Sequence, residues 1–225
     1  MGAVIGELLP LAVGVAISPL PIIAVNSTLL SRNAAKTSTG LLTGWVAGIV
    51  GVVVVVALLV GQAPDTSAGE PSTVSSVLKL VFGLLMLVLA AQQWRERPKP
   101  GQTAVMPKWM SSIDSFGFGK ALGLGLAVSA ANPANLVLLL SAGTTIGAAH
   151  LSSGGDVMVV VVFTLIAAST VTLPVIGCLA ARDRMAQPLE SLRGWLGQNS
   201  ATLMAVLLLV IGVVLLGEGI GELSS

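Results

Sequence analysis

Six long apolar segments, separated by short polar stretches, set the pattern of this chain. Apolar runs of about 18 or more residues are long enough to cross the hydrocarbon core of a bilayer as helices. We therefore expect an all-α membrane protein with six transmembrane helices, over about residues 3–30, 39–61, 74–94, 117–145, 156–181 and 200–221. The first run has no basic residue ahead of it and no small-residue cleavage pattern after it, so we interpret it as a retained helix rather than a signal peptide.

Composition supports this class and excludes several others. The chain is 54% hydrophobic and 9% charged, with a mean hydropathy of +0.95, outside the usual range of soluble domains. Its single Cys178 excludes an internal disulfide, and its single His150 argues against a histidine-built metal site. There is neither a phosphate-binding loop nor a nucleophile with a suitable base. We expect no enzyme activity, no metal or other cofactor and no nucleic-acid partner.

Basic residues predict the orientation. Ten of the eleven Lys and Arg fall in alternate loops, which the positive-inside bias assigns to the cytoplasm: Arg32, Lys36, Arg95, Arg97, Lys99, Lys108, Lys120, Arg182, Arg184 and Arg193. We therefore expect a multi-pass protein of the plasma membrane with both termini extracytoplasmic. Lys79 is the exception, near the outer end of the third run, where we expect it to reach the interface. Trp45, Trp94, Trp109 and Trp195 all fall on the cytoplasmic side, which is typical of interfacial anchors.

Prolines interrupt two of the predicted helices near their middles. Ser18-Pro19-Leu20-Pro21 lies in the first apolar run and Asn132-Pro133 lies in the fourth. A proline removes one backbone hydrogen bond, and in lipid the freed carbonyl finds no water, so such breaks persist where they line a cavity. Paired breaks at matching positions of two halves are typical of the binding site of a transporter.

Pro19 and Pro133 are 114 residues apart, close to half of the 225-residue chain. Because three helices per half invert the second half, we predict two inverted repeats, about 1–112 and 113–225, in a single membrane domain. Helix 6 comes about a dozen residues later than this shift predicts, and the extra length falls in an expected basic loop over 182–198. The alternative is a chance placement of the two prolines.

The residues at the breaks favour a polar ligand. Ser18 and Asn132 are good N-caps, and a proline suits the first position of a new helix. Two half-helices would then point their positive N-terminal ends at the membrane centre, which favours an anionic or strongly polar group. The prolines should also free the carbonyls of Val15, Ile17 and Ser129.

Other polar residues surround this predicted centre. Asn26 and Asn135 inside a membrane suggest a partner or a cavity. Ser27 and Thr28, and the hydroxyls Thr164, Ser169, Thr170 and Thr172, could instead bond back to their own helix. We take the substrate site to comprise Ser18, Pro19, Pro21, Asn26, Asn132, Pro133, Asn135 and Thr170. No predicted helix carries a central charge, which argues against a cation site or a proton relay.

Small residues recur along two helices. Gly40, Gly44 and Gly48 share a four-residue spacing, and Gly119 and Gly123 open the fourth apolar run. This spacing is typical of close helix packing, within the monomer or in a homodimer. A sliding surface for alternating access is the other interpretation.

Several motifs together resemble a known family: SPLPIIAVNSTLLS, GLLTGWVAGI, QQWRERPKPGQ, PKWMSSIDSF, GKALGLGL, NPANLVLLLSAG and WLGQNSATLMAVLLLVIGV. The chain resembles the GAP family of the lysine-exporter (LysE) superfamily, the glycopeptidolipid- and sulfolipid-addressing proteins of actinobacterial envelopes. The resemblance covers nearly the whole chain. It implies a six-helix inverted-repeat fold and a role in moving or delivering envelope glycolipids. The family's motif residues fall on Ser18, Pro19, Pro21, Trp94, Arg95, Arg97, Pro98, Trp109, Asp114, Asn132, Pro133 and Asn135. The family often has Lys where this chain has Ala134, so a cationic partner for an acidic headgroup is absent here.

Three functions remain open at this point. The leading hypothesis is a carrier that exports a glycolipid, with its headgroup at the helix breaks. The second is an accessory protein that docks a separate lipid pump or synthase, and the third is a small-solute exporter with a closed, watery pocket. The basic loop could collect anionic headgroups or contact a partner through Trp94, Arg95, Arg97, Lys99 and Trp109, or merely fix the topology.

Overall fold

The computed structural model describes residues 1–62, 73–97, 113, 115–130, 132–180 and 182–224, and all regular secondary structure in these ranges is helical. The prediction of an all-α protein is confirmed. Eight helices are described: α1 (Gly2–Ala16), α2 (Pro19–Leu29), α3 (Ala34–Gly61), α4 (Thr73–Glu96), α5 (Phe118–Ala130), α6 (Pro133–Ala148), α7 (Ser153–Ala180) and α8 (Arg182–Ser224).

Four helical segments of the described chain are long and apolar enough to cross a membrane: Ala34–Gly61, Ser76–Glu96, Gly154–Ala180 and Gln198–Ser224. Two further spans arise if each bent pair counts as one. α1 and α2 meet at an angle of 48°, and α5 and α6 meet at 70°. The chain therefore has the form of a multi-pass membrane protein with four to six spans.

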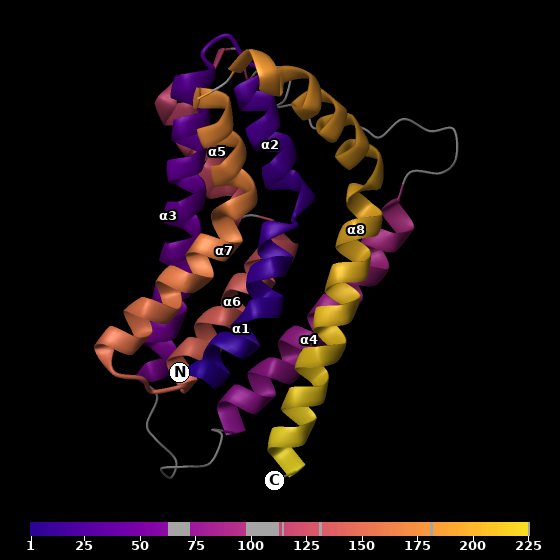
Figure 1. The fold of residues 1–225 in the computed structure, drawn as a ribbon. Helices are drawn as coiled ribbons and strands as arrows, with labels where there is room; N and C mark the ends of the chain where they lie inside the picture. Colours follow the sequence, from indigo (N-terminus) through magenta and orange to yellow (C-terminus); the bar gives the residue numbers. More distant parts are fainter. Residues whose placement is uncertain (63–72, 98–112, 114, 131, 181, 225) are drawn as a thin grey trace.

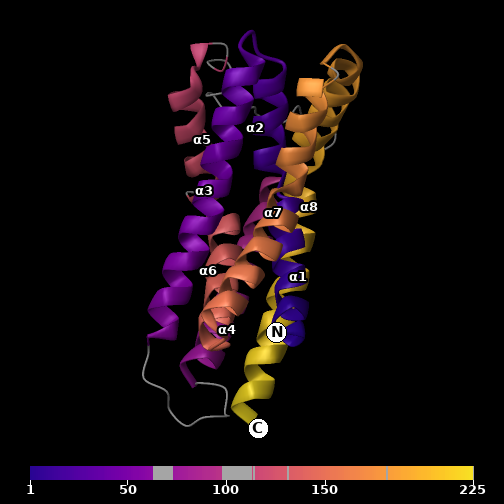
Figure 2. The same ribbon diagram turned by 60° about the vertical axis from the view of Figure 1, so that its left-hand side comes forward.

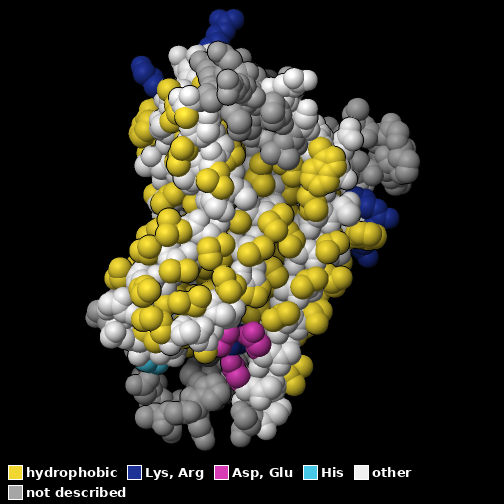
Figure 3. All heavy atoms as spheres, viewed as in Figure 1, with side chains coloured by type: hydrophobic (Ala, Val, Ile, Leu, Met, Phe, Trp, Pro, Cys, Tyr) yellow, Lys and Arg dark blue, Asp and Glu magenta, His cyan; other side chains and the backbone are white. Residues whose placement is uncertain are grey.

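The helices form one elongated bundle with both termini at the same end (Figures 1 and 2). Apolar side chains cover much of the visible surface, and most of the visible basic side chains lie at the other end and along one side (Figure 3). α3 runs alongside α5 and α6, α7 runs alongside α1 and α2, and α4 packs mainly against α8. Since an apolar surface of this extent needs lipid around it, the bundle fits the composition.

Glycines on α3 allow the close approach to α5. A Cβ added at Gly40 or Gly44 would overlap a backbone carbonyl of α5, and one at Gly48 would overlap the Ser129 hydroxyl. The predicted packing role of these three glycines is confirmed. Nothing lies within 4 Å of Gly119 or Gly123, so these two glycines make no close helix contact within the described monomer, and the homodimer alternative stays a prediction. The glycine of α5 that meets α3 is Gly125, two residues beyond Gly123 along the helix.

Trp45 does not anchor at the interface as predicted. Its side chain is 1% exposed and belongs to the main hydrophobic core. Its backbone amide lies beside Gly125 of α5, so this part of α3 faces the bundle interior. Trp94 and Trp195 are 49% and 53% exposed, as interfacial anchors require, whereas Trp109 lies outside the described residues.

The expected loop over 182–198 is helical and forms the beginning of α8. Figure 1 shows this part crossing the end of the bundle obliquely before α8 descends beside α4. Leu189, Leu192 and Leu196 recur at helical spacing, a pattern that predicts an amphipathic helix. Leu196 is buried against Ile22 and Ile23 of α2, which fixes this segment to the bundle.

Candidate functional site

The first helix break is buried except at Ile17, which is 36% exposed. α1 ends at Ala16 and α2 begins at Pro19, with Ser18 as its N-cap. The carbonyl of Val15, expected to be free, accepts a hydrogen bond from the Ser18 amide at 3.2 Å. The Thr170 hydroxyl of α7 instead donates to the carbonyl of Ala16. A side chain from another helix therefore partners the open end of α1, which such a helix end needs in an apolar environment.

Ser18 has a hydroxyl that is itself unusual. The residue is fully buried, and its Oγ has no hydrogen-bond partner among the described residues. N-cap hydroxyls normally accept from an amide in the first turn, but no such bond forms here. A buried hydroxyl left without a partner costs about 1–3 kcal/mol, so a polar ligand at this position would be favoured.

The N-cap residue at the second break is an asparagine, and it makes the side-chain cap bond that Ser18 lacks. Asn132 is the N-cap of α6, with Pro133 at the first position, and its Oδ1 accepts from the Ala134 amide at 3.2 Å. One turn into α6, Asn135 is fully buried and donates from Nδ2 to the carbonyl of Val128 at 3.4 Å. Its Oδ1 is buried and has no partner within the described chain. Each break thus carries one buried oxygen that could accept a hydrogen bond from a ligand.

The other predicted polar residues divide into two groups. Ser27, Thr28 and Ser169 bond back to carbonyls three or four residues earlier in their own helices, the structural role left open from the sequence. Asn26 is fully buried on α2 and Pro21 is buried in its first turn, whereas Pro133 is exposed. Thr170 is the hydroxyl that reaches another helix, and thereby links α7 to the first break.

A lateral groove lies between α3 and α7, in the half of the bundle nearer the termini. Its volume is about 870 Å³. Its walls are formed by α3 and α7, and its floor by the last turn of α6, where Ile146 and Gly147 lie. The wall residues are mostly aliphatic: Val50, Val54, Ala57, Leu58, Val157, Val160, Val161 and Leu165. Thr164 also lines the groove, and its Oγ1 is buried without a partner in the described structure.

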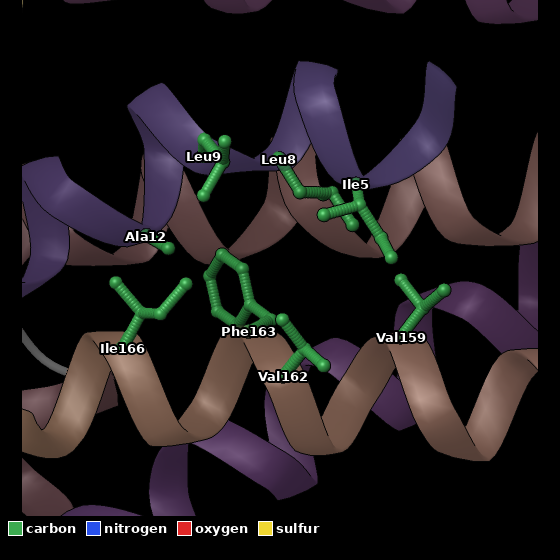
Figure 4. A pocket seen from close by; sticks show the side chains of 8 residues that line it. All are labelled: Ile5, Leu8, Leu9, Ala12, Val159, Val162, Phe163 and Ile166. Atoms are coloured by element: carbon green, nitrogen blue, oxygen red, sulfur yellow. The ribbon is translucent and has the colours of Figure 1, made fainter. Parts of the chain in front are cut away.

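The opposite face of α7 is closed by α1. Figure 4 shows the Phe163 ring pointing between the side chains of α1, with Leu8, Leu9 and Ala12 around it. The residual space in this seam is about 10 Å³, which is room for about one water molecule and too small for a ligand. All eight lining side chains are apolar. The two faces of α7 therefore differ sharply in how far a neighbouring helix fills them.

Comparison with known proteins identifies the family. A family model described as "Sap, sulfolipid-1-addressing protein" matches residues 8–221. The chain belongs to the sulfolipid-1-addressing protein family. This confirms the resemblance read from the motifs, although membership of the LysE superfamily stays a prediction. No curated protein and no solved structure gave a match.

Trp94 and Arg97 lie together at the end of α4. Both were predicted to contact a lipid headgroup or a partner beside the membrane. The Arg97 guanidinium carbon lies 3.9 Å from the centroid of the Trp94 ring, and Arg97 donates to the Trp94 carbonyl at 3.2 Å. Arg95 is exposed in the last turn. Lys99 and Trp109 lie outside the described residues. The described part of this surface is a cation–π pair beside a second exposed arginine.

Sequence reasoning missed one charged cluster. Lys79 does not reach the interface freely: its side chain is 8% exposed, and its Nζ lies 2.5 Å from Glu222, 3.3 Å from Glu218 and 3.7 Å from Glu7. Ser76 adds a hydrogen bond to Glu222 at 2.8 Å. Figure 3 shows these carboxylates gathered at the end where the termini lie.

The charged cluster joins α1, α4 and α8. Lys79 lies three residues after Ser76 on α4, and Glu218 and Glu222 lie four apart on α8, so each pair shares one helix face. That spacing is the sequence pattern that could have predicted the charged cluster. It does so only once α4 and α8 are known to be neighbours.

Proposed function

We propose that this chain carries an amphipathic glycolipid from the inner to the outer leaflet of the plasma membrane, with its headgroup bound at the two helix breaks. One structural observation carries the proposal. Among the buried side-chain atoms without partners in the described structure, Ser18 Oγ and Asn135 Oδ1 are the ones that lie at the two breaks, in a bundle whose core is mainly apolar. A ligand that donates hydrogen bonds would relieve the cost of both. Family membership supports a lipid as that ligand.

Helix packing supports the inverted repeat on which this mechanism depends. In the register given by the glycine contacts, α3 runs parallel to α5 and α6: Gly44 meets Leu122, and Ala57 meets Gly147. α7 runs parallel to α1 in the same way, since Gly155 lies beside Met1 and Thr170 bonds to Ala16. The second helix of each half thus packs on the broken helix of the other half, and α4 packs on α8. An exchange of this kind is expected of two halves related by a two-fold axis in the membrane plane.

Electrostatics at the breaks favours a polar head without requiring a charged side chain. α2 and α6 begin at the breaks, so their N-terminal dipole ends lie there. Neither α2 nor α6 contains Lys or Arg, and Ala134 stands at the position where the family often has Lys. A sulfated or hydroxyl-rich sugar headgroup is therefore recognised through amides, hydroxyls and helix ends.

Leaflet exchange of a sulfated glycolipid in vesicles that contain the purified protein tests the proposal. Ser18→Ala and Asn135→Leu should each slow exchange about tenfold, the effect of losing roughly one hydrogen bond worth 1.4 kcal/mol. Ser141→Ala is the matched control, because Ser141 Oγ is also buried without a described partner but lies further along α6. The double change Asn132→Ala and Pro133→Ala should abolish exchange while the protein still inserts.

The same assay separates the alternatives. Exchange that appears only after a lipid pump is added would favour the accessory role. Transport of amino acids without lipid exchange would favour a small-solute exporter. Unchanged exchange in both the Ser18 and the Asn135 variants would rule out the proposed headgroup site.

A further inference from the structure

The α3–α7 groove has the depth of one bilayer leaflet. On α3 its lining runs from Val50 to Gln62, and on α7 from Asp156 to Leu165. At 1.5 Å per residue these stretches are about 18 Å and 14 Å long, against roughly 15 Å for half of a 30 Å hydrocarbon core. The groove thus extends from the membrane surface on the terminus side to about the middle of the bundle.

Polarity within the groove changes along its depth in the same way as in a lipid. The outer end is lined by Gln62, His150 and Asp156, whereas the walls below them are nearly all aliphatic. His150 stands in the turn between α6 and α7, has a positive φ of 43° and lines the groove. Amide, imidazole and carboxylate groups offer both donors and acceptors to a sugar headgroup.

The inner end of the groove approaches the helix breaks. Val50 lies two residues beyond Gly48, the α3 glycine that meets Ser129 just before the second break. Leu165 lies five residues before Thr170, which bonds to the end of α1 at the first break. A chain lying in the groove would therefore point its tip at the headgroup site.

We infer that this groove is an exit site that holds one acyl chain of the delivered glycolipid. The chain lies along α3 and α7 with its tip toward the bilayer centre, and the sugar lies beside Gln62, His150 and Asp156. This is the orientation of a lipid in the leaflet on the terminus side, which the charge bias makes the outer leaflet. The inference rests on the proposed function. It adds the position that the glycolipid occupies after its headgroup has left the breaks.

The test uses the full chain in nanodiscs with a sulfated glycolipid that carries a diazirine in one acyl chain. After illumination, labelled peptides should map to residues 50–62 and 156–165. Labelling there should exceed labelling of the exposed faces of α4 and α8 about tenfold. A phosphatidylcholine with the same modified chain distinguishes a cargo site from ordinary lipid contact, and it should label the groove no more than those faces.

Two matched leucines of α7 provide the control. Leu165 lines the groove and is 68% exposed, whereas Leu173 is 67% exposed on the same helix and does not line it. Leu165→Trp should reduce groove labelling about tenfold, since the indole fills the space, and Leu173→Trp should leave it unchanged. Val161→Trp repeats the test if Leu165→Trp unfolds in a thermal assay.

Each outcome bears on the inference. Equal labelling by phosphatidylcholine, or unchanged labelling in both groove variants, would overturn the exit site even if leaflet exchange proceeds normally. Selective labelling of the groove without any leaflet exchange would support the lipid site and contradict the proposed transport. The two proposals can therefore fail separately.

Discussion

α7 has two apolar faces, of which one is packed against a neighbouring helix and the other borders an open groove. One face, with Phe163 at its centre, interlocks with α1 and leaves about 10 Å³. The other face, with Val161 and Leu165, borders a groove of about 870 Å³. Side-chain polarity does not explain the difference, because both faces are mainly aliphatic. In a membrane, helices associate through close packing rather than through a hydrophobic driving force, so the shape of the neighbouring helix decides.

The neighbour on the open side is held away by its own contacts. α6 leans on α3, where a Cβ at Gly143 or Gly147 would press on Val53, Val56 or the Ala57 carbonyl. α6 makes few contacts with α7. α5 and α6 meet at a 70° bend, and both pack along α3. The groove therefore lies beside the half-helix that begins at the second break.

The largest expected effect comes from truncating the closed face. Phe163→Ala should lower the free energy of unfolding by about 3–5 kcal/mol, because the ring is 1% exposed and nothing can replace it in the seam. Val161→Ala on the open face should cost less than about 1 kcal/mol, since Val161 is 49% exposed. Unfolding in detergent measures both, and equal losses would contradict the difference between the two faces.

A smaller loss of stability should follow from removing the ion pairs that hold α1 through Glu7. Lys79→Met leaves Glu7, Glu218 and Glu222 facing one another and should cost about 2 kcal/mol. That is less than for a fully buried pair, because the three carboxylates are 24–41% exposed. Lys79→Arg should recover most of the loss. The exposed Lys36→Met is the control, and a loss as large as at Lys79 would argue against the cluster.

The smallest effect is expected at the floor of the groove. Gly147→Ala should cost about 1–2 kcal/mol, because the new Cβ would lie 2.6 Å from the Ala57 carbonyl and push α3 from α6. Gly51→Ala should be neutral or slightly stabilising, since nothing lies within 4 Å of that position. A neutral Gly147→Ala would show that α6 is not held against α3 by this contact.

Sequence reasoning succeeded where local pattern decides the structure. Apolar run length predicted the helices to within a few residues at most ends, and α2 and α6 begin at Pro19 and Pro133. The side-chain cap expected at each start forms at Asn132 but not at Ser18. Four-residue glycine spacing predicted the contact face of α3 but not which glycine of α5 meets it.

What the sequence could not provide depends on which helices become neighbours. Lys79 was assigned to the interface because its carboxylate partners are more than 130 residues away along α8, or on α1. Trp45 was assigned there because its position in the sequence does not show that the side chain belongs to the core. The groove has no motif at all, since it is the space left where α6 packs on α3 and makes few contacts with α7.

A structure of the chain in lipid nanodiscs that contain a sulfated glycolipid tests the central claim most directly. We predict elongated lipid density in the α3–α7 groove, with its polar end at Gln62, His150 and Asp156, and no density in the α1–α7 seam. Density between α1 and α7, or a groove closed by contact of α6 with α7, would contradict the account.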